Sequence, residues 1–226
     1  MLDIIFLSYD EPYADNNFAK LQERFPYAKR VANVKGIDKA HLAAAKAATT
    51  TFFYVVDADA VIREEFNFDY RPTVDKQRYV HIWRAYNPAI GLTYGYGGVK
   101  LFSKKFFKTM QTEFLDFSTT LTKDIQIMKD TVSDTVFYKN PMTAFRSGFR
   151  EATKLYKTVK TAGDEERSTA ELRLTAWCNP LPVENAELIQ LGAWEGMRNA
   201  DNFGTDKYID INDFSKITDL YHDCAG

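Results

Sequence analysis

Runs of apolar residues alternate with polar, helix-patterned segments over the first sixty positions. Strands are expected over residues 3–9, 29–34 and 52–56, where β-branched and aromatic side chains dominate. Helices are expected between them, over residues 14–25 and 38–48, the second of which is rich in alanine. A β-α-β-α-β series with short connections predicts parallel strands and right-handed crossovers. The ends of these strands should therefore lie at one edge of a sheet.

The third of these strands is followed by two carboxylates. Its residues, Phe52 to Val56, suit a strand that is buried on both faces, and Asp57 and Asp59 stand at its C-terminal end. Open α/β sheets bind ligands at that end. Two aspartates one residue apart in an extended chain point the same way and can hold Mg²⁺ or Mn²⁺ for a phosphorylated substrate. Turn or cap aspartates explain the same pair equally well.

The middle of the chain predicts a further strand, a glycine-rich approach and candidate bases. A strand is expected over residues 79–86, and the start of a helix from residue 103. Gly97 and Gly98 stand where the backbone must approach a neighbour closely, ahead of a short strand, or else form a flexible hairpin turn. Asp116 and Asp124, the latter on an expected helix that runs through Met128, are carboxylates that could act as a base. A helix cap or a solvated surface would explain either one as well.

A strongly patterned helix is expected over residues 144–160. Arg146, Arg150 and Lys154 fall on one row at successive i, i+4 and i+8 positions, beside a separate apolar stripe. Guanidinium groups bind phosphate oxygens with paired donors, so the row is a candidate for holding a diphosphate or a nucleic-acid backbone. A basic face turned to water is the alternative.

The C-terminal third is predicted to be helical. Helices are expected over residues 165–177, 184–199 and 210–220, with Asn212 or Asp213 as an N-cap of the last. Gly192 and Gly196 indicate a close crossing or a bend. The predicted fold is therefore an α/β mixed sheet of Rossmann type flanked by helices, with a core over residues 1–130 and a helical part over residues 131–226 that completes the same domain.

Composition narrows the class of protein. The chain has 29 basic and 31 acidic residues, so no overall positive field indicates nucleic acid or membranes. No apolar run is long enough to span a bilayer. Cys178 and Cys224 fit neither a metal motif nor a disulfide framework, which favours a reducing compartment. A cytoplasmic protein without membrane contact is expected.

Taken together, these residues resemble a known family. The β-α-β-α-β half, the Asp57-Ala58-Asp59 motif and the later Gly97-Gly98 pair are similar to nucleotide-sugar-dependent glycosyltransferases of the GT-A fold, over about residues 2–128. The stretches Phe-Arg-Ser-Gly-Phe-Arg-Glu and Leu-Gly-Ala-Trp-Glu-Gly further resemble small glycosyltransferase-like proteins of tailed phages and other large DNA viruses. That second resemblance implies a location in the host cytoplasm.

The resemblance implies a role for particular positions. Asp59 would bind the cation, Mn²⁺ or Mg²⁺, and Asp57 would contact it through water or contact the ribose. Gly97 and Gly98 would frame the sugar, and His222 would complete the metal shell. The remaining positions would contact the nucleotide or its diphosphate: Ser8, Tyr9, Asp10, Lys35, Asp38, Arg150 and Lys154. The family's Glu-Asp base pair has no clear counterpart, which leaves the choice between Asp116 and Asp124 open.

The implied reaction moves a sugar from a nucleoside-diphosphate sugar to an acceptor hydroxyl. The viral resemblance implies a hydroxymethylated base in double-stranded phage DNA as the acceptor, whereas the balanced net charge favours a glycan or protein. A nucleotidyltransferase would use the same carboxylates, but it usually has a glycine-rich loop after its first strand, which residues 8–12 lack. A non-catalytic nucleotide- or glycan-binding module is the alternative from a different class.

Overall fold

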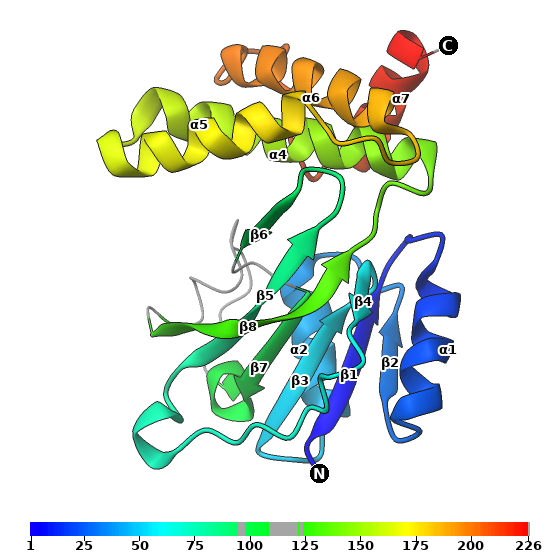
Figure 1. Cartoon of the computed structure of the whole chain (residues 1–226), viewed down its shortest axis with the longest axis vertical. Helices are drawn as coiled ribbons and strands as arrows, with labels where there is room; N and C mark the ends of the chain where they lie inside the picture. Colours follow the sequence, from blue (N-terminus) through cyan, green and yellow to red (C-terminus); the bar gives the residue numbers. More distant parts are fainter. Residues whose placement is uncertain (95–97, 109–121, 123, 226) are drawn as a thin grey trace. The chain divides into compact units, whose positions relative to one another are not determined.

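The computed structural model describes residues 1–94, 98–108, 122 and 124–225. It divides into two compact units (Figure 1). The first comprises Met1–Tyr86 with Thr93–Thr135, and the second comprises Asn87–Leu92 with Val136–Gly226.

The first unit begins with the predicted series of strands and helices. Its elements are β1 (Asp3–Ser8), α1 (Ala14–Arg24), β2 (Lys29–Ala32), α2 (Ile37–Ala47) and β3 (Phe52–Asp57). β1 lies between β2 and β3 and pairs in parallel with both. Their register places Ser8 beside Ala32 and Leu7 beside Asp57, so the predicted meeting of the strand ends at one edge is confirmed.

The rest of the sheet is mixed in direction. Its elements are β4 (Ala60–Ile62), η1 (Val74–Lys76), β5 (Val80–Asn87), β6 (Leu92–Tyr94), β7 (Val99–Ser103), η2 (Lys104–Lys108) and β8 (Ile125–Thr135). The described strands form one eight-stranded sheet in the order β2-β1-β3-β7-β5-β8-β4, with β6 beside β5. β7 is antiparallel to both β3 and β5. The predicted mixed α/β sheet flanked by helices is thus confirmed.

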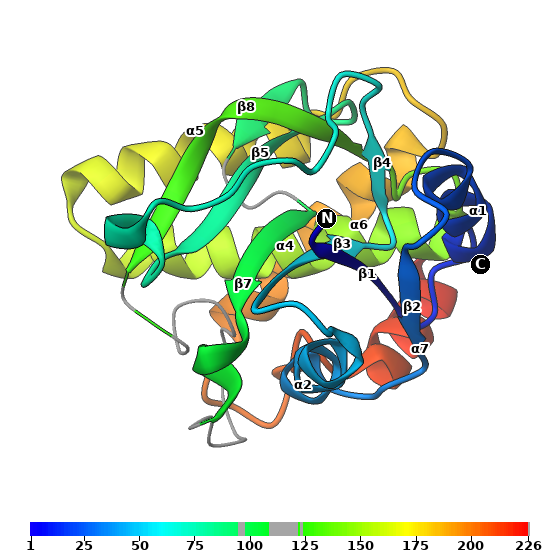
Figure 2. The same cartoon turned by 90° about the horizontal axis from the view of Figure 1, so that it is seen from below.

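Each face of the sheet has its own helix. On one face, Leu21 of α1 packs into a cluster with Tyr54 and Trp83. On the other face, the buried alanines of α2 lie against Phe53 and Phe102. Figure 2 shows α1 and α2 on different sides of β1 and β2. β3 is therefore buried on both faces, as its unbroken apolar run predicts.

One element was expected to be a helix and is a strand. The helix that was predicted to carry Asp124 and run through Met128 is wrong, because residues 125–135 form β8. β8 pairs in parallel with β5 and antiparallel with β4. Its β-branched side chains, Ile125, Ile127 and Thr131, favour a pleated strand, and long-range pairing outweighs the local helical spacing.

A buried carboxylate ties the starts of the first three strands together. Asp3, which is 8% exposed, accepts a hydrogen bond from the Lys29 ammonium at the start of β2 at 2.7 Å. Its other oxygen accepts hydrogen bonds from the backbone N–H and the hydroxyl of both Thr49 and Thr50, just ahead of β3. Burial alone raises the pKa of Asp3, but these donors outweigh burial and hold the pKa far below its ordinary value.

This network predicts an acid-dependent loss of stability. Because the pKa of Asp3 is lower in the folded chain, its contribution is fully present above the unfolded pKa of about 4 and is lost as pH falls below it. At pH 7, Asp3→Asn should lower the free energy of unfolding by roughly 2–3 kcal/mol. Urea unfolding of both proteins from pH 7 downwards should show the difference shrinking below about pH 4.

The matched control is Asp15→Asn. The Asp15 carboxylate is likewise paired with a cation, the Arg30 guanidinium, but the Asp15 side chain is 92% exposed. Exposed pairs contribute at most about 1 kcal/mol, so this variant should unfold almost as the wild type does. Equal effects of the two substitutions would contradict the role given to Asp3.

The second unit contains four long helices. They are α4 (Pro141–Thr161), α5 (Asp164–Cys178), α6 (Ala186–Asp201) and α7 (Phe214–Ala225), which confirms the predicted helical C-terminal part. Asp213 is the N-cap of α7, since its carboxylate accepts the Lys216 N–H at 3.2 Å. Among the described helices, none is long and apolar enough to cross a membrane.

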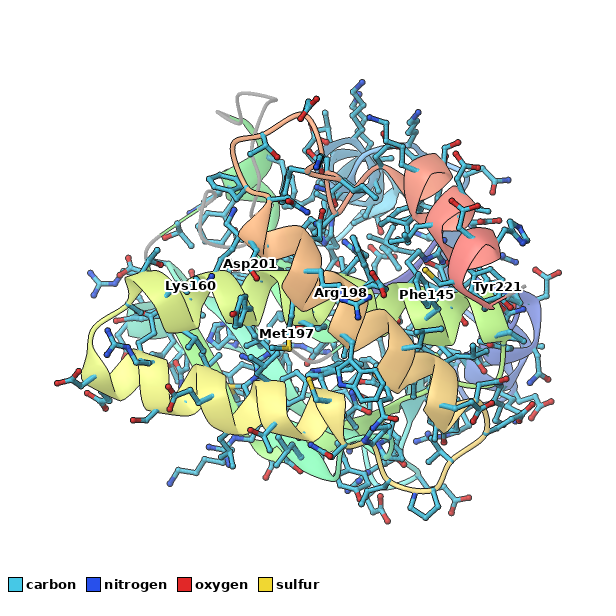
Figure 3. The ribbon with its side chains drawn as sticks, turned by 90° about the horizontal axis from the view of Figure 1, so that it is seen from above. Phe145, Lys160, Met197, Arg198, Asp201 and Tyr221 are labelled. Carbon is cyan, nitrogen blue, oxygen red and sulfur yellow. The ribbon has the colours of Figure 1, made fainter. Side chains whose placement is uncertain are left out.

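α4 and α6 cross at very short range through glycines. A methyl group built on Gly192 or Gly196 of α6 would lie 2.1 Å from the Phe145 carbonyl oxygen or 2.3 Å from that of Phe149. Gly148 of α4 faces α6 in the same way. Figure 3 shows α6 alongside α4, with Lys160 near Asp201 toward one end. Of the two readings of the α6 glycines, the close crossing is confirmed.

The crossing predicts a steep cost for one methyl group. Gly192→Ala should lower the free energy of unfolding by about 1–3 kcal/mol or more, because the new atom meets backbone rather than a movable side chain. Gly163→Ala is the control, since a methyl group there meets nothing within 4 Å, and it should cost well under half as much. Thermal and urea unfolding of both variants test this, and a harmless Gly192→Ala would contradict it.

Candidate active site

The carboxyl edge of β1, β2 and β3 gathers most of the predicted site residues of the first unit. Ser8 ends β1, Asp57 ends β3, and Lys35 follows β2. α1 and α2 both begin at this edge, so their N-terminal N–H groups favour negative charge there. The prediction that these segments meet is therefore confirmed. The contacts of each side chain then determine whether it is available to bind a ligand.

Asp57 is paired with Lys100, a residue that was not among the predicted site residues. The ammonium of Lys100, on β7, lies 2.7 Å from one carboxylate oxygen of Asp57. Lys100 stands opposite Val55 in the β3–β7 register, and Asp57 is the next residue on the same face of β3. The signal was present in the sequence, as one charged residue inside the apolar run Val99 to Phe102.

Asp59 lies in a strongly acidic environment. The pKa of Asp59 is raised to about 7: burial contributes most, the nearby charges of Asp57 and Glu11 add to it, and Lys100 opposes them. Glu11 is fixed in turn, because one of its carboxylate oxygens accepts the Tyr9 N–H at 2.7 Å. At neutral pH a substantial fraction of Asp59 is thus protonated, and a bound cation would favour its charged form.

These carboxylates fit a divalent cation only together with a substrate. Magnesium sites commonly use one or two protein carboxylates plus substrate phosphate oxygens. Asp57 and Asp59 supply such a pair. In the described part of the chain, however, no group of three or more His, Cys, Asp or Glu side chains could hold a metal ion by itself. Two carboxylates leave most of the coordination positions of such a cation to water or to oxygens of a substrate.

Gly98 brings β7 against the carboxylate turn. Its carbonyl oxygen accepts the Asp57 N–H at 2.8 Å, and a methyl group on Gly98 would lie 2.4 Å from the Ala60 Cβ. The predicted close backbone approach is confirmed at this position. Gly97 and Asp116, two other predicted site residues, lie outside the described residues.

The loop after β1 is partly committed to the fold. The Ser8 hydroxyl accepts a hydrogen bond from the Arg30 Nε at 2.9 Å, so it already has a protein partner. Tyr9 is 43% exposed and Asp10 is also exposed. An exposed aromatic ring beside carboxylates is suited to stacking on a planar base.

The loop after β2 carries an exposed lysine, Lys35, and leads to a carboxylate in the first turn of α2, Asp38. Lys35 is exposed, and Asp38 lies in the first turn of α2, where a carboxylate is stabilised by the helix dipole. Gly36 between them has a φ of 98°, which favours glycine. Asp38 thus has a structural role that needs no ligand.

Asp124 lies at the other edge of the sheet. Its carbonyl oxygen accepts the Val80 N–H at 3.0 Å, and its carboxylate lies 3.5 Å from Arg78. β8 runs parallel to β5, and both run parallel to β3, so Asp124 is level with the start of β3 rather than with Asp57. A base at Asp124 would be separated from the carboxylate pair by the length of a strand.

The predicted basic row belongs to the second unit and contacts other parts of it. The Arg150 guanidinium donates to the Ile211 carbonyl oxygen at 2.8 Å, and Arg146 stacks over the Phe214 ring at 4.4 Å. Lys154 pairs with Glu151. His222 lies on the last turn of α7, exposed and next to the Tyr221 ring. All three cations of the row therefore have partners within the second unit.

Comparison with known proteins assigns the chain to no family. No family model matches the sequence, and no curated protein matches it either. Among solved structures, the chain is similar to a crystal structure of HddC from Yersinia pseudotuberculosis, with 13% sequence identity and a TM-score of 0.32. That match covers 61% of this chain and 90% of the other. The function is therefore inferred from the chemistry of the site.

The packing of Gly98 predicts a substitution that a second one repairs. Gly98→Ala should cost about 1–3 kcal/mol of unfolding free energy, because its methyl group overlaps the Ala60 Cβ. Adding Ala60→Gly removes that atom and leaves Asp57 Cβ at 3.4 Å as the nearest contact, so the double variant should recover most of the loss. Urea unfolding of the two single variants and the double variant measures the coupling; simple additivity would contradict the contact.

Proposed function

We propose that the carboxyl edge of β1, β2 and β3 binds a nucleoside-diphosphate sugar and that the protein is a glycosyltransferase. The observation that carries the proposal is the group of Asp57, Asp59 and Glu11 beside Lys100, at the strand ends where open α/β sheets bind ligands. Asp59 is half-buried with its pKa raised to about 7, and perturbed groups of this kind gather at functional sites.

The roles follow from the type of side chain. Asp57 and Asp59 would hold Mn²⁺ or Mg²⁺ together with the diphosphate, and the cation would supply positive charge against the charge that develops on the leaving diphosphate. Tyr9 would stack on the base, with Ser8 and Asp10 beside the ribose. Further contacts are proposed for Lys35, Asp38, Gly97 and Gly98.

The basic row and the terminal histidine remain proposed contacts. Guanidinium groups bind phosphate oxygens with paired donors, and Arg150 donates to the Ile211 carbonyl oxygen and to the Asn212 side-chain oxygen. Arg146, Arg150 and Lys154 are proposed to contact phosphate oxygens, and His222 is proposed as a metal ligand. An inverting reaction also needs a base, for which Asp116 is the proposed residue, whereas a retaining reaction does not need one in the same place.

The acceptor is proposed as a hydroxyl group. A hydroxymethylated base in double-stranded DNA belongs to this class, and hydroxyls of a glycan or protein are the alternatives. The internal partners of Arg146 and Arg150 weaken the argument for DNA that their spacing alone provides, because a backbone phosphate would have to compete for those donors.

The proposal predicts donor hydrolysis or transfer that depends on Asp59. With Mn²⁺ and a panel of nucleotide sugars, the wild type should release nucleoside diphosphate, and Asp59→Asn should reduce the rate by about 100-fold or more. Asp75→Asn is the control, since Asp75 lies exposed in η1 and accepts a hydrogen bond from the Thr73 hydroxyl at 2.7 Å; it should leave the rate unchanged. Loss of activity in both variants would contradict the assignment.

Parallel assays separate the acceptors and the rival functions. Labelled sugar should be counted on hydroxymethylated DNA, plain DNA, glycans and protein. Tight nucleotide binding with no turnover on any acceptor would favour the binding module. Formation of a nucleotide sugar from a sugar phosphate and a nucleoside triphosphate would favour a nucleotidyltransferase. Either result would overturn the glycosyltransferase proposal.

A further inference from the structure

Lys100 is an unusual residue for the position that it occupies. It lies within β7 between the buried residues Val99 and Leu101, and its side chain is only 13% exposed. Lysine is seldom buried unless it is paired. The Asp57 carboxylate, 36% exposed and 2.7 Å from the ammonium, is that partner.

The charges around Lys100 do not balance. The charges of Asp57 and Glu11 both act on Asp59, and Lys100 is the cation that opposes them there. His41 of α2 adds no positive charge at neutral pH, because burial and the Lys100 charge lower its pKa to about 4. Its Nδ1 lies 2.8 Å from the Ile37 carbonyl oxygen. Three carboxylates therefore lie near Lys100, and its ammonium contacts a single oxygen of one of them, Asp57.

An ammonium in that place competes directly with a metal ion. It occupies one of the two Asp57 oxygens that a divalent cation could use, and it repels the cation over a similarly short distance. A lysine ammonium is also a compact charge on a flexible stem, so it can turn to a phosphate oxygen when one arrives. Arginine in its place would keep the charge but would bind the carboxylate with a planar, less movable group.

We propose that Lys100 is a positioning residue that holds Asp57 and prevents the Asp57 and Asp59 pair from retaining a divalent cation until a substrate phosphate is bound. The proposal rests on the proposed function of this edge as a diphosphate-binding site. It makes the cation and the nucleotide bind cooperatively, because the phosphate supplies oxygens to the cation and a new partner to the ammonium.

Manganese binding to the protein alone tests this proposal. Free Mn²⁺ is measured by electron paramagnetic resonance during titration of the wild type, with and without a nucleoside diphosphate. The wild type should bind Mn²⁺ weakly alone and more tightly with the nucleotide. Lys100→Met, which removes the competing charge, should bind Mn²⁺ alone at least about tenfold more tightly and show less cooperativity.

Two variants serve as controls for the charge. Lys100→Arg keeps the positive charge and should bind Mn²⁺ alone as weakly as the wild type does. Lys104→Met removes a neighbouring lysine whose ammonium donates to the Ala48 carbonyl at 2.6 Å, and it should also match the wild type. If Lys100→Met does not fold, Lys100→Gln, which keeps a donor without the charge, gives the same measurement.

Two results of the Mn²⁺ titration would overturn the proposal. Unchanged or weaker Mn²⁺ binding by Lys100→Met would mean that Lys100 only supports the fold. Equally tight binding by the wild type with and without nucleotide would exclude cooperativity. Sugar transfer is not part of this assay, so tighter Mn²⁺ binding by Lys100→Met in a protein without turnover would sustain the role of Lys100 and refute the transferase. Transfer with unchanged Mn²⁺ binding would do the reverse.

Discussion

The parallel register of β1 with β2 and β3 is the constraint on which the first unit depends. Asp3 fixes it at one end, because a single carboxylate binds Lys29 at the start of β2 and both threonines ahead of β3. Strands rise by about 3.3 Å per residue, so a register that is set at one edge also sets the other. The position of Asp57 beside Leu7 is therefore decided as much by the contacts of Asp3 at the start of the strands as by contacts at their carboxyl ends.

Within each unit, two elements approach each other closely at a glycine. Gly98 lies against Ala60 at the carboxylate turn, and Gly192 lies against the Phe145 carbonyl in the crossing of α4 and α6. In each case the absent side chain leaves room for another element, which is why the sequence signalled a close approach at these positions. The sequence did not signal which element would approach.

The same limit separates what the sequence predicts from what it does not. Local period and composition are enough for β1 to β3, for α1 and α2 and for the C-terminal helices, because their packing agrees with their local pattern. β8 departs from its expected helix because pairing with β5 and β4 decides its structure. Spacing likewise placed Arg146 and Arg150 on one face of α4, but only the fold brings Phe214 and the Ile211 carbonyl to that face.

The pairing of Lys100 with Asp57 shows why charge at such a site cannot be read from a motif. An Asp-x-Asp sequence indicates two anions, but the register of a distant strand adds a cation to one of them and leaves the other beside Glu11. The two aspartates are then unequal before any ligand binds: one is neutralised by an ammonium, and the other has a pKa raised to about 7. Under the proposed function, a ligand that brings both negative oxygens and a metal ion would satisfy all of these groups at once, whereas a metal ion alone would meet the ammonium first.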